Sequence, residues 1–346
     1  MAIKVGIVGL GYSARTFHLP FLKSLEPYRV TAVMSRQAEL AQTLLPGARH
    51  RRSMSELLDD QVDLVVITAP NTEHFALART ALVARKHVVL EKPFVNTADE
   101  GRELIALARR ENLVLSVYHN RRWDGDFLTV TRLLQQGVLG QVFHYESHFD
   151  RFRPEPRPRW REAPLPGSGI LYDLGSHLID QALILFGAPR SVAAQVLSQR
   201  RGAEVDDYMH LVLDYAPLQV ILHASMLTAR PGTRFSIHGD RYSFIKEGLD
   251  PQEDRLKAGL EPVGSKWAEE SPESFGTLHD PEGGDERVPT DAGAYQRYYQ
   301  SLADCIVNGA PNPVPPEQAL KVIQLIELAL LSQKTGQRIS LTDLRL

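Results

Sequence analysis

The sequence predicts an α/β fold of two domains. An N-terminal doubly wound parallel sheet precedes a C-terminal α/β domain with a large open, mostly antiparallel sheet. Up to about residue 121, short apolar runs alternate with helix-like segments, as in a parallel sheet whose strands are joined by helices. Beyond that point, strand-like runs follow one another without helices between them, which indicates antiparallel pairing. Because 346 residues are many for one core, we expect domains over residues 1–121 and 122–346, with C-terminal helices that can pack back on the first domain.

The composition is typical of a soluble globular protein and excludes several other classes. Hydrophobic residues make up 43% and charged residues 23% of the chain, and the net charge of −3 gives no reason to expect nucleic acid or a membrane as a partner. One cysteine, Cys305, excludes an internal disulfide and a cysteine-built metal site. No apolar run approaches the roughly 18 residues of a membrane span, and the chain begins without an export signal. We therefore expect a cytoplasmic protein.

The first stretch of the chain predicts a dinucleotide site. The apolar run over residues 3–8 stops at Gly9-Leu10-Gly11, and a helix-like segment begins near Ser13 and Ala14. In this Gly-x-Gly-x-x-Ala pattern the first glycine permits a tight turn, the second lets the backbone approach a pyrophosphate, and Ala14 lets helix and strand pack closely. An ordinary strand-to-helix turn has the same pattern, but its place before a strand–helix alternation favours a Rossmann domain. The residues expected beside the cofactor are Gly9, Gly11, Tyr12, Ser13 and Ala14.

The end of the second predicted strand, residues 29–34, indicates which dinucleotide is bound. An acidic residue there would hold the ribose hydroxyl of NAD, whereas an arginine accommodates the 2′-phosphate of NADP. This chain has Ser35 and Arg36, and its next carboxylate is Glu39. A hydroxyl followed by a guanidinium suits a phosphate, so NADP is favoured and NAD stays possible. The alternative is that Arg36 is only a solvated surface charge.

A later strand, predicted over residues 62–68, also ends in polar candidates. Ligands of open α/β sheets bind beyond the carboxyl ends of the strands. Thr68, Pro70, Asn71 and His74 lie at or just after such an end, so we expect them near the cofactor. For His74, a role in starting the following helix fits equally well.

The strand predicted over residues 86–90 is closed by Glu91-Lys92-Pro93. Proline restricts the residue before it to extended conformations, so Lys92 is held at the end of the strand. Its ammonium could there donate a hydrogen bond to a substrate oxygen. The alternative is a surface lysine before a loop.

The other expected elements follow from periodicity and end signals. Helices are expected over residues 37–45, 55–58, 75–84, 99–111 (with Thr97 as N-cap), 127–136, 295–308 and 316–334, and strands over 113–118, 142–149, 191–197, 209–215, 219–225 and 234–238. Residues 246–291 are rich in Gly, Pro, Asp and Glu and are expected to form surface excursions.

A helix with one apolar stripe is predicted to follow Gly169 and to end at Gly187. Its other face carries Asp173, His177 and Asp180. A carboxylate one turn from a histidine can orient the ring and stabilise its charged form, as a general base requires. A structural helix-surface contact has the same spacing. Since neither two histidines nor three carboxylates at metal spacing occur here, we expect no metal.

Together these motifs resemble the Gfo/Idh/MocA family of oxidoreductases. The resemblance rests on Gly9-Leu10-Gly11, Pro70-Asn71 with His74, Glu91-Lys92-Pro93, Trp160-Arg161, and the segment of residues 167–180 with Asp173 and His177. Three further segments are similar to the branch that includes NADP-dependent scyllo-inositol dehydrogenase: His18-Leu19-Pro20, residues 120–124 and residues 249–254. Ser168 stands where the family often has a third glycine.

The resemblance implies roles for the site residues. His177 would take the hydroxyl proton, Lys92 would hydrogen-bond the same oxygen, and Asp173 would position the substrate or His177. Glu91 and Asn120 would line the nicotinamide side of the cofactor, and Trp160 with Arg161 would close over it. The open sheet would form the interface of a homodimer or homotetramer.

These observations predict an NADP-dependent dehydrogenase or reductase that interconverts a secondary alcohol and a ketone on a cyclitol, polyol or sugar. A reductase of dicarbonyls, imines or dihydrodiols on the same scaffold is one alternative. A regulator that senses a dinucleotide or sugar without turnover is another.

Overall fold

The structure is a computed structural model that describes residues 2–58, 61–230, 232–264 and 266–341. The chain divides into two compact units, each built from three segments. Unit 1 comprises Met1–Asn120, Gln252–Ala268 and Ala294–Leu320, and unit 2 comprises Arg121–Pro251, Glu269–Gly293 and Lys321–Leu346. Unit 1 therefore takes in segments from the second half of the chain.

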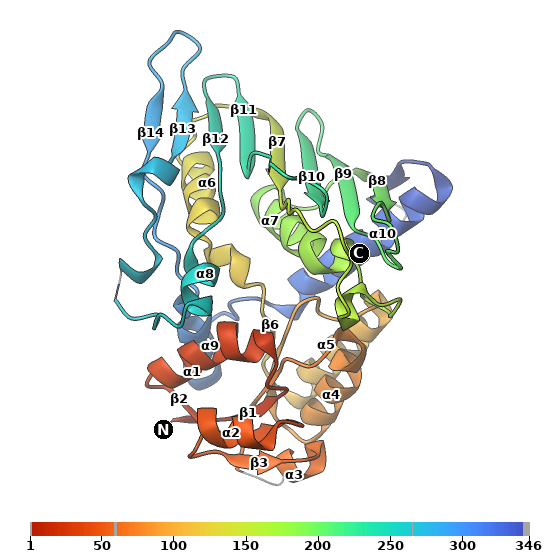
Figure 1. Ribbon diagram of the computed structural model, residues 1–346, viewed down its shortest axis with the longest axis vertical. Helices are drawn as coiled ribbons and strands as arrows, with labels where there is room; N and C mark the ends of the chain where they lie inside the picture. The colour runs from red at the N-terminus through yellow and green to blue at the C-terminus, as the bar shows by residue number, and fades with distance from the viewer. Residues whose placement is uncertain (1, 59–60, 231, 265, 342–346) are drawn as a thin grey trace. The chain divides into compact units, whose positions relative to one another are not determined.

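Unit 1 contains a six-stranded parallel sheet with the strand order β3-β2-β1-β4-β5-β6 (Figure 1). Its strands are β1 (Ile3–Val8), β2 (Tyr28–Met34), β3 (Arg49–Arg51), β4 (Leu64–Ile67), β5 (His87–Leu90) and β6 (Leu115–Val117). The order reverses beside β1, and the crevice beyond the strand ends at such a switch point is where doubly wound sheets bind ligands. The predicted Rossmann sheet is confirmed.

The helices of unit 1 come from the stretches between these strands and from later segments of the chain. They are α1 (Leu19–Ser24), α2 (Ala38–Leu44), α3 (Met54–Leu58), α4 (Asn71–Val83), α5 (Ala98–Glu111), α8 (Gln252–Lys257) and α9 (Gln296–Asn308). The helix α5 begins with a capping box formed by Thr97, the predicted N-cap, and Glu100. From α9, the hydroxyl of Tyr298 donates to Ser116 in β6 at 3.0 Å, and the Tyr299 carbonyl accepts from Tyr28 in β2 at 2.6 Å. These buried tyrosines fix α9 on the sheet.

Unit 2 contains a nine-stranded sheet with the strand order β14-β13-β12-β11-β7-β10-β9-β8-β15. Its strands are β7 (Val142–His148), β8 (Ser191–Leu197), β9 (Tyr208–Asp214), β10 (Gln219–Ser225), β11 (Phe235–Gly239), β12 (Ser243–Lys246), β13 (Gly276–His279), β14 (Glu286–Val288) and β15 (Ile339–Ser340). The pairing of β7 with β10 is parallel, and the other pairs are antiparallel. The mostly antiparallel sheet is confirmed.

The expectation of surface excursions over residues 246–291 was wrong in part. This stretch supplies α8 to unit 1, and to unit 2 it supplies β13 and the edge strand β14. The strands are only four and three residues long, and their alternation is too short to be distinguished from the surrounding Gly- and Pro-rich sequence.

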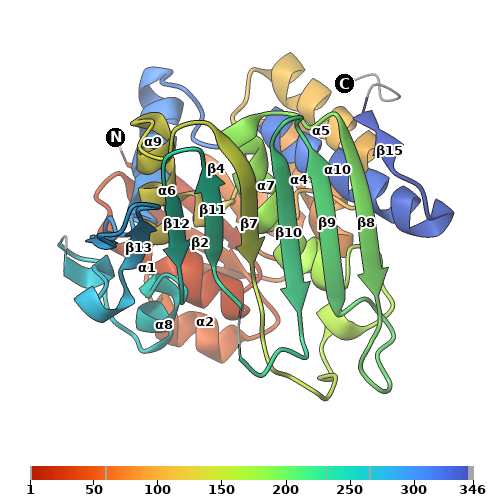
Figure 2. The same ribbon diagram turned by 90° about the horizontal axis from the view of Figure 1, so that it is seen from above.

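The two faces of the unit 2 sheet differ in character. Met209, Leu211 and Leu213 of β9 are buried, whereas the alternate residues of the strand are partly exposed. The buried face packs against α6 (Gly125–Gln135) and α7 (Ser176–Phe186). Figure 2 looks onto the opposite face, with α7 behind the sheet. This face carries polar side chains from several strands, among them His148 and His223.

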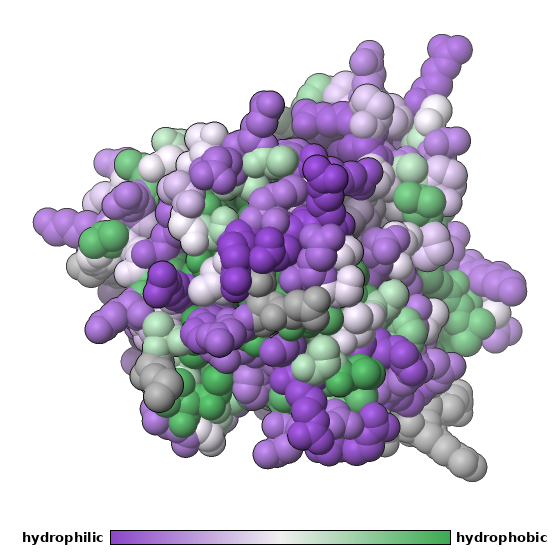
Figure 3. Space-filling model, turned by 90° about the horizontal axis from the view of Figure 1, so that it is seen from below, coloured by the Kyte–Doolittle hydropathy of each residue, from purple (hydrophilic) through white to green (hydrophobic). Residues whose placement is uncertain are grey.

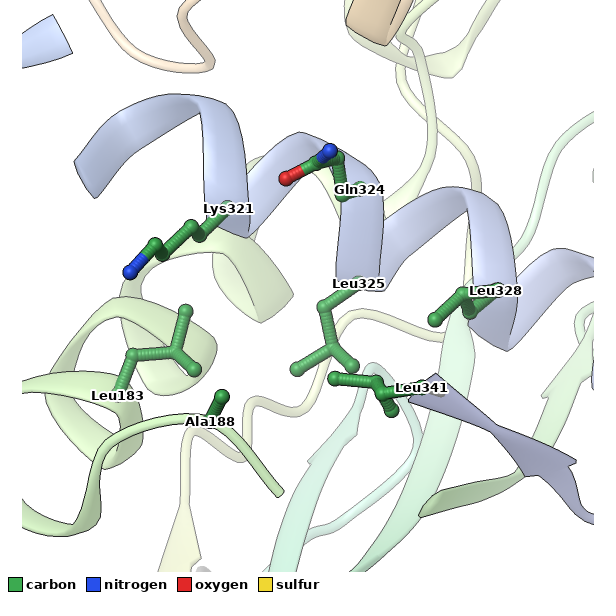
Figure 4. Close-up of a pocket in the computed structure, with 7 residues that line it drawn as sticks. All are labelled: Leu183, Ala188, Lys321, Gln324, Leu325, Leu328 and Leu341. Atoms are coloured by element: carbon green, nitrogen blue, oxygen red, sulfur yellow. The ribbon is translucent and has the colours of Figure 1, made fainter. Parts of the chain in front are cut away.

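The long helix α10 (Pro316–Thr335) covers an apolar cluster in unit 2. In Figure 4, Leu325 of α10 and Leu341 point toward one another, and Leu183 of α7 lies nearby. The cavity between these residues measures about 10 Å³, which is room for one water molecule at most. It is a packing imperfection of the core and too small for a substrate.

The surface shown in Figure 3 is mostly hydrophilic, with hydrophobic residues in small separate groups. Among the described residues, no helix combines the length and the apolar character that crossing a membrane requires.

Candidate functional site

The glycine turn after β1 fits the pyrophosphate of a dinucleotide. Gly9 has φ +90°, and a Cβ there would lie 2.9 Å from the Thr68 Oγ1, so a side chain is excluded. A Cβ on Gly11 would meet no atom within 4 Å, which leaves the backbone open on that side. Ala14 is buried and begins a π-helical turn, Ala14–His18, that leads into α1. Tyr12, 47% exposed, donates a hydrogen bond to Glu253 at 3.1 Å.

Glu91 connects the glycine turn to the end of β5. Its carboxylate accepts hydrogen bonds from the Ser13 hydroxyl and, at 2.9 Å, from the Lys92 backbone N–H. His18 Nε2 lies 3.0 Å from Oε1, and its Nδ1 lies 2.6 Å from the Tyr299 hydroxyl. Burial raises the pKa of Glu91, but the hydrogen bond and charge of His18, with Lys92 and Ser13, lower it to about 2. Glu91 is therefore an ionised carboxylate that holds Ser13 and Lys92 in place.

His74 contacts the backbone of two loops of unit 1. Its Nδ1 lies 2.9 Å from the Pro93 carbonyl oxygen and its Nε2 lies 3.0 Å from that of Ala69. The ring is buried, and this burial lowers the pKa of His74. Both ring nitrogens face backbone carbonyls, so in this geometry His74 links the segments that follow β4 and β5.

Other predicted residues of unit 1 lie at the carboxyl ends of strands. The Thr68 hydroxyl donates to the Val8 carbonyl at 3.1 Å, and Pro70 is the N-cap of α4, whose first residue is the buried Asn71. After β6, Asn120 is buried as well.

Ser35 and Arg36 follow β2. The Ser35 hydroxyl accepts a hydrogen bond from the Gln37 N–H at 3.0 Å, and the Ser35 carbonyl lies 2.7 Å from His50 Nε2. Arg36 is exposed and forms no ion pair with any carboxylate in the described part of the chain. A positive charge is thus displayed at the strand end where the ribose of a dinucleotide is held.

In unit 2, a π-helical turn, η4 (Leu171–Gly175), leads into α7. Asp206 holds the start of this turn, since its carboxylate accepts from the Leu171 N–H at 2.8 Å and its carbonyl from the Ile170 N–H at 2.9 Å. Gly169 has φ +92°, and a Cβ there would lie 2.0 Å from the Asp206 carboxylate. Burial raises the pKa of Asp206 to about 6. Sequence reasoning missed Asp206 because it lies 35 residues beyond its partner.

Trp160, Arg161 and Asp173 lie together. Arg161 Nε lies 3.5 Å from Asp173 Oδ1, and its guanidinium stacks 4.3 Å from the centre of the Trp160 ring. The Ser168 hydroxyl donates to the Trp160 carbonyl oxygen at 3.0 Å, and the Gly169 N–H donates to the Arg161 carbonyl oxygen at 3.1 Å. The loop is thereby fixed to the start of η4.

His177 lies in the first turn of α7 and is 5% exposed, with its ring centre 6.5 Å from that of Phe149. Asp180, predicted on the same helix face, forms a bidentate ion pair with Arg122 at 2.6 and 2.8 Å. The side chains of Arg122 and Asp180 are 9% and 3% exposed. This pair fixes α7 to the preceding segment of unit 2, so the carboxylate of Asp180 has a structural partner.

A second buried arginine holds α7 on the sheet and was not predicted. Arg234 Nε donates to Asp126 of α6 at 3.1 Å, and its Nη2 donates to Gln181 of α7 at 2.9 Å. The guanidinium also stacks 4.5 Å from the centre of the Phe149 ring. No local pattern distinguishes such a residue from a surface arginine, because its partners come from distant parts of the chain.

The predicted site residues thus belong to both units. Lys92 and the glycine turn are in unit 1, and Trp160, Arg161, Asp173 and His177 are in unit 2.

Two family models match the chain. The model described as "Oxidoreductase family, NAD-binding Rossmann fold" matches residues 3–119. The model described as "Oxidoreductase family, C-terminal alpha/beta domain" of the same family matches residues 131–341. Together they cover most of the chain, and the first identifies unit 1 as carrying a binding site for a nicotinamide dinucleotide.

Several individual relatives are similar over nearly their whole length. The chain is 43% identical to scyllo-inositol 2-dehydrogenase (NADP(+)) IolW of Bacillus subtilis, over 98% of this chain and 96% of the relative. It is 44% identical to the oxidoreductase YdgJ of Escherichia coli, over 96% of each. The solved structure of the oxidoreductase yvaA from Bacillus subtilis superimposes with a TM-score of 0.93 at 41% identity, covering 98% of this chain and 99% of that one.

Proposed function

Since the chain belongs to the Gfo/Idh/MocA family of oxidoreductases, we propose that it is an NADP-dependent dehydrogenase of a cyclitol, polyol or sugar. The reaction would interconvert a secondary alcohol and a ketone. The observation that carries this proposal is the similarity over 98% of the chain to an NADP-dependent scyllo-inositol 2-dehydrogenase. Scyllo-inositol is therefore the first substrate to test.

The preference for NADP is supported by Arg36. An exposed guanidinium after β2 can pair with a 2′-phosphate, and no acidic residue stands there to hold a ribose hydroxyl or to repel the phosphate. The open backbone at Gly11 and the start of the first helical segment would hold the pyrophosphate.

We assign the proton chemistry to three side chains. The nicotinamide, when bound, supplies the chemistry of hydride acceptance and donation. His177 would accept the proton of the substrate hydroxyl as the carbonyl forms. Lys92, held by the neighbouring carboxylate of Glu91, would donate a hydrogen bond to the same oxygen and stabilise its developing negative charge. Asp173, beside Arg161, would orient the substrate or His177.

Single substitutions test these roles. We expect His177→Gln and Lys92→Met each to lower kcat about 10²- to 10⁴-fold, the usual contribution of a positioned acid or base, with little change in the Kd for NADPH. Steady-state kinetics and fluorescence titration measure the two quantities. The matched control is Lys23→Met, because Lys23 is an exposed lysine at the end of α1. Wild-type turnover in either site variant would refute the assignment.

A further inference from the structure

A cluster on the open face of the unit 2 sheet has the composition of a metal site. His148 and His223 are direct neighbours in the parallel pairing of β7 with β10, and Asp150 follows β7. Figure 2 shows these two strands side by side. Each of the three side chains offers one ligand atom, and these atoms all lie within 4.8 Å of one another. The cluster is remote in sequence from Lys92, Asp173 and His177, and the proposed dehydrogenase chemistry makes no use of it.

The interatomic distances are close to those that a tetrahedral metal imposes. His148 Nδ1 lies 3.1 Å from Asp150 Oδ2, and His223 Nε2 lies 3.5 Å from Asp150 Oδ1. Ligands bound to Zn²⁺ at about 2.0–2.1 Å in a tetrahedron are separated by roughly 3.4 Å. Small side-chain rotations would therefore bring all three groups onto one ion.

Two features of Asp150 and His148 are typical of built metal sites. The Asp150 side chain is only 2% exposed, and its Oδ1 makes no hydrogen bond within the described part of the chain, although His223 Nε2 faces it at 3.5 Å. A buried carboxylate oxygen that makes no hydrogen bond is costly, and a bound cation would satisfy it. The other nitrogen of His148, Nε2, lies 2.7 Å from Glu146. A metal-bound histidine commonly donates its second N–H to such a carboxylate, which orients the ring and strengthens the ligand.

Gly232 leaves space beside the cluster. Its N–H donates to Asp150 Oδ2 at 3.1 Å, and a Cβ there would lie 2.9 Å from His148 Nδ1 and 3.1 Å from Asp150 Oδ2. Any side chain at residue 232 would crowd the atoms that face the ion.

We propose that His148, Asp150 and His223 bind a divalent transition metal ion, with Zn²⁺ preferred. Two imidazoles and one carboxylate suit Zn²⁺, whereas Mg²⁺ and Ca²⁺ prefer oxygen ligands throughout. Three protein ligands leave a fourth position for water or another group. The ion would join the ends of β7 and β10, the parallel pair at the centre of the sheet.

This site could not be predicted from the sequence. The two histidines are far apart along the chain, and only the parallel pairing of their strands makes them neighbours. Spacing rules for metal ligands look for residues within one helix or one loop.

The test is a titration of the full-length, metal-free chain with ZnCl₂ by isothermal calorimetry in the presence of excess Mg²⁺. We expect one Zn²⁺ per chain with a micromolar or tighter Kd. His223→Asn and Asp150→Asn should each weaken binding at least about 100-fold. Gly232→Ala should also weaken binding, and it tests the site without removing a ligand if the other variants fold poorly.

The matched control is His279→Asn. His279 belongs to the same sheet and pairs with Asp285 at 2.8 Å, and it lies outside the cluster of His148, Asp150 and His223. Its loss should leave Zn²⁺ binding unchanged. Absence of stoichiometric binding to the wild-type chain, displacement of Zn²⁺ by Mg²⁺, or equal weakening in His279→Asn and His223→Asn would overturn the proposal. Since none of these residues belongs to the dinucleotide or proton-transfer groups, failure here leaves the proposed dehydrogenase function intact.

Discussion

At the scale of single residues, we propose that Arg36 selects NADP over NAD. We expect Arg36→Ala to weaken NADPH binding at least tenfold, or about 1.4 kcal/mol, because a charge-assisted hydrogen bond to a phosphate is lost. The affinity for NADH should stay the same. Tryptophan or nicotinamide fluorescence titration gives both dissociation constants.

Arg79→Ala is the matched control for Arg36, because Arg79 is an exposed arginine of α4 that pairs with Glu103 at 2.8 Å. It removes the same charge away from the end of β2. An equal loss of NADPH affinity in both variants would mean that net charge, and not Arg36, selects the cofactor.

The lowered pKa of Glu91 predicts how the free energy of unfolding depends on pH. The pKa of Glu91 is lowered to about 2 in the folded state, against an ordinary value of 4.5, so the folded state favours the ionised form. The stabilisation is present above about pH 4.5 and is lost as the pH falls toward 2, with a magnitude on the order of 3 kcal/mol. Urea denaturation of wild-type protein and of Glu91→Gln at pH 7 should differ by about that amount, and the difference should shrink below pH 4.5.

The control for Glu91 is Glu103→Gln, which removes the partner of Arg79 in an exposed ion pair. Such a pair contributes about 0–1 kcal/mol, so its loss should change stability little at any pH. A Glu91→Gln variant as stable as wild type at pH 7 would contradict the role of Glu91.

Residues that act through local sequence could be predicted, and those that act through remote partners could not. Gly9 and Ala14 belong to a pattern of six consecutive residues, so the tight turn at Gly9 and the close packing at Ala14 can be predicted from the spacing. Asp206 and Arg234 form hydrogen bonds with partners that are distant in sequence and come close only when the chain folds. His74 was expected just after the end of a strand and lies in the first turn of α4, but its two carbonyl partners could not be predicted from the sequence.

At the scale of elements, the entry to α7 positions the proposed base. Asp206 accepts the Leu171 N–H in the first turn of η4, and His177 follows within the next turns. We expect Asp206→Ala to cost about 1 kcal/mol of stability through the lost hydrogen bond and to lower kcat more than it raises KM.

The conservative variant Asp206→Asn keeps a carbonyl oxygen for the Leu171 N–H and should retain most of the activity. The pKa of Asp206 is raised to about 6, so its folded state favours the protonated form and loses stability as the pH rises from about 4 through 6. Asp206→Asn should lack this loss. If Asp206→Ala matched wild type in kcat and in stability, the carboxylate would have no part in holding the turn.

The elements themselves were predicted best where they are long or fully buried. Apart from β3, the strands of unit 1 follow from apolar runs, and the start of helix α5 follows from its N-cap Thr97. The strands β3, β14 and β15 are two or three residues long and give no usable periodicity. The parallel pairing of β7 with β10 could not be predicted either, since alternation along a strand does not specify its neighbour.

At the scale of the whole molecule, the sequence predicted two bodies and C-terminal helices that can pack back on the first domain, but it did not predict the return of Gln252–Ala268 to unit 1. The change from strand–helix alternation to successive strands is visible near residue 121, where unit 2 begins. The return of Gln252–Ala268 and Ala294–Leu320 to unit 1 depends on tertiary packing, such as that of Tyr298 and Tyr299 with the sheet residues. Changes in composition along the chain do not reveal that a later segment packs with the first unit.

The measurement that tests the central claim most directly is steady-state formation of NADPH by the full-length chain with scyllo-inositol and a panel of other cyclitols, polyols and sugars, repeated with NAD⁺. We predict turnover on at least one of these alcohols, with kcat/KM at least tenfold higher for NADP⁺ than for NAD⁺. Tight binding of NADPH without turnover on any alcohol or on the corresponding ketones would contradict the proposed dehydrogenase and favour a regulator that senses the dinucleotide.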